Sequence, residues 1–156
     1  MEKQFEPFLN ASSKGDTAGQ DRAFVIFRMP DDKAFFGEYF RAEDVEQLGW
    51  DSDAEVDGEE TTLKTMMRVI ARGARFHARC KPPKEDPRTV VKERESKVQP
   101  VKPVPVEQFA IEFVADNGKR FSFLGNFVYV GGAYRYVGKG AFPFWSMPDA
   151  NDPSKH

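Results

Sequence analysis

The residues with the spacing of a metal site lie in an acidic run at positions 51–60, which reads Asp-Ser-Asp-Ala-Glu-Val-Asp-Gly-Glu-Glu. In a calcium-binding EF-hand loop, oxygen ligands alternate and then a glycine makes a sharp turn. Four residues match the first half of that pattern: Asp53, Glu55, Asp57 and Gly58. The second half does not fit, because Lys64 occupies the position that must supply a bidentate carboxylate. Repulsion among the acids favours a solvated loop that leads into the next helix, and we expect no bound metal.

Acid–base catalysis would require a histidine, carboxylate or tyrosine that reaches into an apolar pocket. The residues that could serve are His77, Glu112, Tyr129 and Tyr134. On the strand expected around position 77, alternation places His77 opposite Phe76, and Glu112 likewise points away from its apolar neighbours. The pattern therefore favours a basic outer face over an internal acid–base pair.

The chain has no evident nucleophile or phosphate-binding loop. Cys80 is the single cysteine, which excludes an internal disulfide and a cysteine-based zinc site. Its neighbours Arg79 and Lys81 would lower the pKa of the thiol, but alternation points Cys80 inward, so we expect a buried, unreactive thiol. The glycines at 131, 132, 138 and 140 lack the strand-to-helix setting of a phosphate loop. We expect no cofactor.

Basic residues alternate with apolar residues between positions 75 and 81. Phe76, Ala78 and Cys80 share one parity, and the other parity is basic throughout: Arg75, His77, Arg79 and Lys81. A period of two predicts a strand with an apolar inner face and a basic outer face. With Arg68 and Arg72 of the preceding segment, this face is a candidate anion-binding surface whose affinity would fall steeply with salt.

The elements that would position these residues are clearest near the C-terminus. Eleven of the 21 aromatic residues lie between positions 109 and 145, in alternating runs separated by Asn117-Gly118 and Gly131-Gly132. Such turns join antiparallel strands, and Gly125 allows a bulge or bend in the second strand. We expect a ligand cavity to be lined by aromatic residues of this region: Phe113, Phe123, Phe127, Tyr129, Tyr134 and Trp145. The ending at 138–145 would cover the sheet edge or the cavity mouth.

Two helices and one buried apolar segment are expected in the first 40 residues. Apolar spacing predicts a helix at 3–13, and Asp31 or Asp32 would cap another helix that runs to about Phe40. Residues 22–29 contain an apolar run rich in aromatic and β-branched side chains, which favours a buried strand. A helical segment of that length is also compatible with the run.

Two further helices and a long loop complete the expected elements. Helices are predicted at 42–48 and 62–74, and the longer one carries an apolar stripe of Leu63, Met66, Met67, Ile70 and Ala74. Gly73 stands near its end, where a C-terminal cap is natural. Residues 82–106 hold six of the eleven prolines, mixed with charged residues, and are typical of an exposed loop.

Length and composition indicate one ordinary domain. A chain of 156 residues supports a single core, so we assign 1–146 to one α+β domain and 147–156 to a polar tail. No stretch approaches the roughly 20 apolar residues of a membrane span. The N-terminus lacks a secretory pattern, so the chain as written is expected to be cytoplasmic, or exported if a signal was removed.

The two parts of the chain carry opposite charge. Residues 1–60 contain 6 basic and 16 acidic side chains, whereas residues 61–156 contain 17 basic and 9 acidic ones. These charges would attract each other within one domain, or across the interface of a homodimer. A nucleic-acid partner is not expected, since nucleic-acid-binding domains are usually basic overall.

Helices followed by a curved antiparallel sheet resemble the cone-shaped NTF2-like and cystatin-like α+β domains. The stretch at 125–139, Gly-Asn-Phe-Val-Tyr-Val-Gly-Gly-Ala-Tyr-Arg-Tyr-Val-Gly-Lys, also resembles the terminal hairpin of an uncharacterised group of bacterial proteins. The resemblance is limited to this hairpin region and implies an architecture, with helices packed on a curved sheet of four or five strands. It transfers no catalytic residue.

Two classes of function are compatible with these patterns. The first is a non-catalytic domain, which holds an apolar small molecule in an aromatic cone or packs its sheet against a protein partner or a second copy. The second is a small acid–base enzyme of the NTF2-like type, an isomerase or dehydratase, with a pocket carboxylate or histidine. A titratable side chain of shifted pKa inside the cavity would favour the enzyme. We expect the first class.

Overall fold

The computed structural model describes residues 1–44, 52–70, 73–81, 101, 102 and 104–138. The fold is α+β, because helices come first and a four-stranded antiparallel sheet follows in the order β1-β2-β3-β4. The helical elements are α1 (Glu2–Lys14), α2 (Thr17–Phe24), the 3-10 helix η1 (Val25–Phe27), α3 (Asp32–Tyr39) and α5 (Ser52–Ile70). The strands are β1 (Phe76–Lys81), β2 (Val106–Ala115), β3 (Arg120–Val130) and β4 (Ala133–Gly138). This arrangement confirms the expected fold class.

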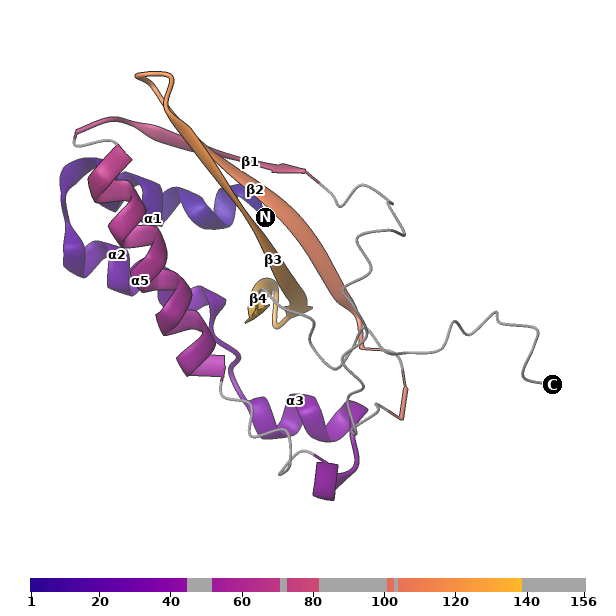
Figure 1. Ribbon diagram of the computed structural model, residues 1–156. Helices are drawn as coiled ribbons and strands as arrows, with labels where there is room; N and C mark the ends of the chain where they lie inside the picture. The colour runs from indigo at the N-terminus through magenta and orange to yellow at the C-terminus, as the bar shows by residue number, and fades with distance from the viewer. Residues whose placement is uncertain (45–51, 71–72, 82–100, 103, 139–156) are drawn as a thin grey trace.

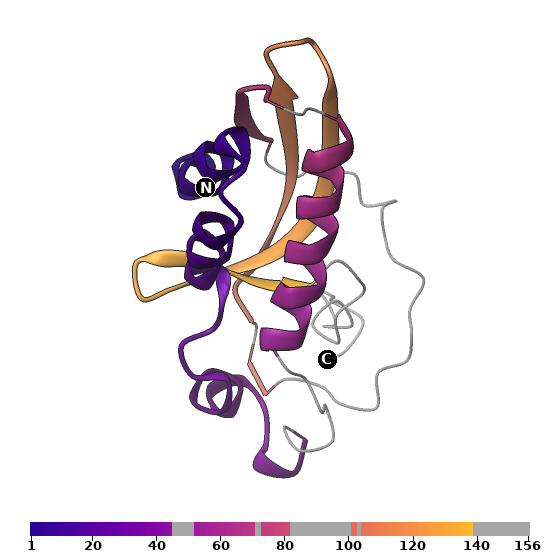
Figure 2. The ribbon, with the colours of Figure 1, turned by 90° about the vertical axis from the view of Figure 1, so that its left-hand side faces the viewer.

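Two layers form the body of the domain. Figure 1 and Figure 2 show α1, α2 and α5 over one face of the sheet, whose long strands β2 and β3 curve past them without closing. The main core lies between the layers, and partly buried side chains of β1 pack against it. Its buried members come from the helices and from β2, β3 and β4, among them Phe5, Phe8, Phe24, Phe27, Val56, Leu63, Ile111, Phe113, Phe127 and Tyr136. No helix within the described ranges is long and apolar enough to cross a membrane.

The first helix forms as predicted. Phe5, Phe8 and Leu9 are buried on one side of α1. The helix ends at Gly15, whose φ of 69° lies in the left-handed region that glycine adopts without strain. The side chain of Asp16 then caps α2, because it accepts a hydrogen bond from the backbone N–H of Gly19 at 2.8 Å.

The strand favoured at 22–29 is wrong, because these residues belong to α2 and η1 and the segment that follows them. Phe24 and Phe27, three positions apart, are buried, whereas Val25 and Ile26 between them are 58% and 41% exposed. An unbroken apolar run has no polar positions that would reveal its period. The helix that starts upstream simply continues into the run.

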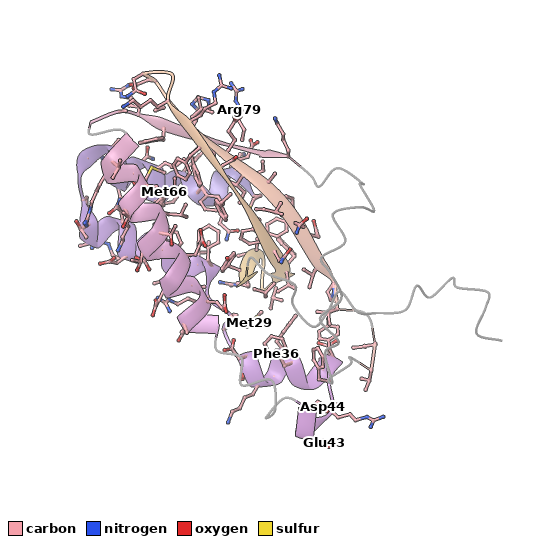
Figure 3. All side chains as sticks on the ribbon, viewed as in Figure 1. Met29, Phe36, Glu43, Asp44, Met66 and Arg79 are labelled. Carbon is pink, nitrogen blue, oxygen red and sulfur yellow. The ribbon has the colours of Figure 1, made fainter. Side chains whose placement is uncertain are left out.

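The third helix packs on the opposite face of the sheet, near one end. The side chain of Asp31 accepts a hydrogen bond from the N–H of Ala34 at 2.9 Å, which confirms the predicted cap. Met29 and Phe36, both labelled in Figure 3, join a second core whose other members are Phe35, Phe40, Val128 and Val137. Residues 42–44 are helical, and the remainder of the helix expected at 42–48 lies outside the described residues.

The solvated loop expected at 51–60 is also wrong, because α5 begins at Ser52. Val56 and Leu63, which are seven positions apart and therefore on the same face of the helix, are buried. Glu59 and Glu60 are only 6% and 8% exposed. Arg28 forms ion pairs with Asp53 at 3.0 Å and with Asp57, so the acidic turn is partly neutralised. Acids in a first turn also favour the positive end of the helix dipole.

The hairpins of the sheet have the predicted turns. Between β2 and β3, the Asn117 side chain accepts a hydrogen bond from the N–H of Lys119 at 3.0 Å, and Gly118 has a φ of 81°. Between β3 and β4, Gly131 and Gly132 have φ of 60° and 79°, which only glycine adopts readily at both positions. Figure 2 shows this second turn, in yellow, extending sideways past the N-terminal helices.

Gly125 lies beneath two aromatic rings of its own strand. A Cβ at this position would stand 2.7 Å from a ring carbon of Phe127 and 3.0 Å from one of Phe123. Its partner across the sheet is Phe109 on β2. The register between β3 and β4 shifts between Asn126 and Phe127, immediately after the glycine where a bulge or bend was expected.

Side chains from the first turn of α1 reach both outer strands of the sheet. The carboxylate of Glu2 accepts a hydrogen bond from the N–H of Cys80 on β1 at 2.8 Å. The amide of Gln4 donates to the carbonyl of Tyr134 on β4 at 2.7 Å and accepts from its N–H at 3.0 Å. One backbone group of β1 and two of β4 that a further strand could otherwise use are therefore bonded to α1.

Of the loop expected at 82–106, residues 82–100 and 103 lie outside the described ranges. The end of the loop is attached to α3. The N–H of Val101 donates to the carbonyl of Tyr39 at 2.7 Å, and Lys102 forms an ion pair with Glu38 at 2.7 Å.

Candidate functional site

Of the aromatic residues expected to line a cavity, four of those that the structure describes pack in or against the main core. Phe113 and Phe127 are buried in the main core, and Phe123 packs against it with its ring centroid 5.9 Å from that of Phe113. Tyr134 is half-buried, whereas Tyr129 on the same hairpin is 57% exposed. Trp145 lies outside the described residues.

The interior at these residues is filled by the protein itself. Phe5 of α1 has its ring centroid 5.3 Å from that of Phe113, and Phe27 of η1 lies 4.6 Å from Phe5. The void between α1, α2, α5 and the sheet has a volume of about 10 Å³. That is roughly the space of one water molecule, well below the ~300 Å³ of a small-molecule pocket.

A carboxylate and a phenol meet at the edge of this void. The hydroxyl of Tyr136 on β4 donates to the Glu59 carboxylate on α5 at 3.3 Å, and both residues are more than nine-tenths buried. Burial raises the pKa of the Tyr136 hydroxyl, and the charges of Glu59 and Glu55 raise it further. Tyr136 therefore stays protonated and acts as a hydrogen-bond donor.

The sequence interpretation did not single out Glu59 or Tyr136. The signal was present, because Glu59 lies three residues after Val56 and four before Leu63, on the apolar stripe of α5. It was missed because this part of the chain was taken as a loop, where such spacing has no meaning.

The four residues considered for acid–base chemistry do not come together in one site. His77 is exposed on the outer side of β1, opposite in parity to Phe76, as alternation predicted. Glu112 lies on the same outer side of β2 and forms an ion pair with Arg120 at 3.6 Å. Tyr129 and Tyr134 contact each other, with ring centroids 5.0 Å apart, at the β3–β4 turn.

The thiol of Cys80 faces the core and is half-buried. Burial raises its pKa to about 11, and the negative charge of Glu2 contributes. The thiol is therefore protonated at neutral pH, which agrees with the expected unreactive cysteine.

The predicted basic face is present on β1. Arg75, His77, Arg79 and Lys81 are exposed, and Phe76, Ala78 and Cys80 pack on the core. Figure 3 shows Arg79 on the side of the sheet that faces away from α1 and α5. Arg68 is exposed on α5, in the other layer, and Arg72 lies outside the described residues.

One further cation belongs to the same face. The pairing registers align His77 of β1 with Val114 of β2 and then with Arg120 of β3, so the outer face extends across three strands. Arg120 was not among the sequence candidates, because only the strand register places it in line with β1.

The EF-hand half-match does not form a loop. Its acids lie on the first turns of α5, and no group of three or more His, Cys, Asp or Glu side chains suited to a metal occurs among the described residues. Burial alone would lower the pKa of Arg28, but its hydrogen bonds with Asp57 and Asp53 raise it. These acids therefore act as ion-pair partners within the domain.

An open groove lies between α1 and α2. It has a volume of about 360 Å³ and is lined by Pro7, Asn10, Ala11, Lys14, Asp16, Gly19, Arg22 and Ala23. Arg22 and Asp16 form an ion pair at its rim at 3.6 Å, with both side chains largely exposed. The groove holds none of the residues that the sequence predicted for a site.

Comparison of the chain with protein-family models, with curated proteins and with solved structures gave no match.

Proposed function

We propose that this chain is a non-catalytic interaction domain that binds its partner on the outward face of the sheet. The supporting observation is the difference between the two faces. The inner face is occupied by phenylalanines of the chain itself, with a void of about 10 Å³. The outer face of β1–β3 presents exposed cationic side chains from two strands.

Hydrogen bonds from α1 to the two edge strands favour side chains over backbone pairing as the means of recognition. Strand addition requires free backbone N–H and C=O groups at an edge strand. Glu2 bonds such a group on β1, and Gln4 bonds two on β4. A partner would therefore meet the side chains of the outer face before it could pair with the backbone.

Kinship with NTF2-like or cystatin-like domains belongs to the same proposal. Its support is the order of helices before a curved antiparallel sheet, with a register shift beside Gly125. A partner-binding role for such a cone would leave its interior packed, as it is here.

A second candidate is a ligand carrier or acid–base enzyme of the NTF2-like type. It is favoured by the contact between Glu59 and Tyr136, which puts a carboxylate and a proton donor beside the aromatic interior. That function requires the phenylalanines to move apart, because the present void admits no more than about one water molecule.

Native mass spectrometry of the purified protein separates the two candidates. The interaction domain predicts a native mass equal to that of one or two copies of the chain, with no small molecule released on unfolding. A stoichiometric small molecule that is released only on unfolding would overturn the proposal in favour of a carrier or enzyme. Light scattering on the same sample gives the oligomeric state at low and high salt.

A further inference from the structure

We infer that the partner of the outer face is an acidic protein segment in extended conformation, bound by Arg79, Lys81 and Arg120. This inference rests on the proposed function, because it names the partner of the same face. The three cations share that face with His77, and Glu112 is the carboxylate between them. Counted on these residues with His77 neutral, three positive charges and one negative charge leave a net charge of +2.

The spacing of the cations matches an extended chain. Arg79 and Lys81 are two residues apart on β1, which places their side chains roughly 7 Å apart. Alternate side chains of an extended peptide have the same repeat, so carboxylates at every second position would meet successive cations. Arg120 lies two strands away, about 10 Å across the sheet.

The charges on β1 are exposed and available. No ion pair within the described residues involves Arg79 or Lys81, whereas Arg120 is held by Glu112 at 3.6 Å. Charged side chains on an edge strand also discourage edge-to-edge aggregation. Here Glu2 already occupies the Cys80 amide of β1, and the basic face continues onto β3, where there is no edge to protect.

Among the described residues of β1–β3, no aromatic side chain has the outer parity, and this favours a protein over a nucleic acid. Binding of single strands uses aromatic side chains on which bases stack. The aromatic residues of β1–β3 that pack on the core have the inner parity, among them Phe76, Phe109, Phe113, Phe121, Phe123 and Phe127. The outer face offers Ser122 and Leu124 beside its cations.

The test measures binding of a fluorescein-labelled peptide of alternating glutamate and serine residues by fluorescence anisotropy. We expect the wild-type protein to bind it at low salt and to lose affinity as salt rises, because exposed charges are screened within about 10 Å at 0.1 M salt. The variant Arg79→Glu/Lys81→Glu should bind at least about tenfold more weakly, since two attractive contacts become repulsive.

A matched control replaces two cationic side chains with glutamate in another part of the protein. Lys14→Glu/Arg22→Glu alters two exposed cations on α1 and α2, in the helical layer, and should keep the wild-type affinity. Circular dichroism and melting temperature verify that both variants fold. Equal weakening in both variants would overturn the assignment of the face, because net charge alone would then explain binding.

Two other outcomes would overturn the assignment of the partner as an acidic protein segment. A thymidine oligonucleotide of equal charge that binds more tightly than the peptide, and loses binding in the β1 variant, would identify a nucleic-acid surface. A doubled mass at low salt that disappears in the β1 variant would identify a second copy of the chain. If the native mass shows no retained small molecule and the peptide does not bind, the inference of an acidic partner is refuted. The proposed function as an interaction domain would not be refuted by that result.

Discussion

Replacing Gly125 with alanine should destabilise the domain, although the change adds a single methyl group. The new Cβ would stand 2.7 Å from a ring carbon of Phe127 and 3.0 Å from one of Phe123. Carbon atoms in contact prefer about 3.5 to 4.0 Å, so at least one ring must shift. Phe127 is only 1% exposed and packs on Phe27, Phe109 and Tyr136, so its ring cannot move without disturbing its neighbours.

The size of the effect follows from two opposing contributions. An extra methyl group forced into a packed core costs about 1 to 3 kcal/mol, whereas alanine in place of glycine gains about 0.4 to 1 kcal/mol by restricting the unfolded chain. We expect Gly125→Ala to lower the free energy of unfolding by about 1 to 2 kcal/mol. For a domain of this size the melting temperature would fall by about 2 to 8 °C.

Urea unfolding followed by circular dichroism measures the change, and Gly37→Ala is the matched control. Gly37 lies within α3, and a Cβ there would meet no atom within 4 Å. The control should gain about 0.5 to 1 kcal/mol from improved helix propensity. If Gly125→Ala were as stable as Gly37→Ala, the close packing of the two rings over the glycine would be refuted.

Three further changes test other parts of the fold. Gly58→Ala, in α5 with no atom within 4 Å of the added Cβ, should raise the free energy of unfolding by about 0.5 to 1 kcal/mol; no gain on urea unfolding would favour a loop there. The pKa of the Cys80 thiol is raised to about 11 from 9.0, so its protonated form stabilises the fold below pH 9 and this contribution is lost as pH rises through 11. Relative to Cys80→Ala, the wild-type protein should therefore lose about 1 to 2 kcal/mol across that range, because partial exposure of the thiol to solvent reduces the full effect of the shift, and parallel pH curves would contradict this. Arg135→Lys should cost about 1 to 3 kcal/mol, because the guanidinium donates to the carbonyls of Val130 at 3.2 Å, Ile26 at 2.5 Å and Arg28 at 3.3 Å; an unchanged urea midpoint would show that an ammonium suffices.

The C-terminal meander could be predicted because its signals are local. Glycine at 118, 131 and 132 marks positions with positive φ, and alternation of aromatic and polar residues gives the buried face directly. The basic face of β1 could be predicted for the same reason, since a period of two is visible within six residues.

The N-terminal half was harder because its decisive contacts are distant in sequence. The acids at the start of α5 are stabilised in the helix in part by ion pairs with Arg28, which lies 25 residues before Asp53. The apolar run at 22–29 had no polar positions to reveal a helical period. In both segments, tertiary contacts decided between two locally acceptable conformations.

Residues of the candidate sites were missed for related reasons. Glu59 would have been recognised only if the helix predicted to begin at position 62 had been predicted to begin at Ser52. Arg120 joins the basic face through pairing across β2, and Gln4 meets Tyr134 over a separation of 130 residues. Patterns within a short window carry no information on such pairings.

The opposite charges of the two parts of the chain are partly used within the domain. Lys64 pairs with Asp21 and with Glu60, and Lys102 pairs with Glu38, so basic side chains from the second part neutralise acids of the first. Arg79 and Lys81 do not take part in these ion pairs, and they are the cations that we assign to a partner.

The most direct test of the outer face as the binding surface is methyl NMR during titration with the glutamate–serine peptide. Leu124 is 41% exposed on the outer face, in line with Lys81, whereas Leu63 and Ile111 are buried in the core. We predict that the Leu124 methyl signals shift while those of Leu63 and Ile111 stay in place. Shifts at Leu63 and Ile111 with an unchanged Leu124 would instead place the ligand between the helices and the sheet.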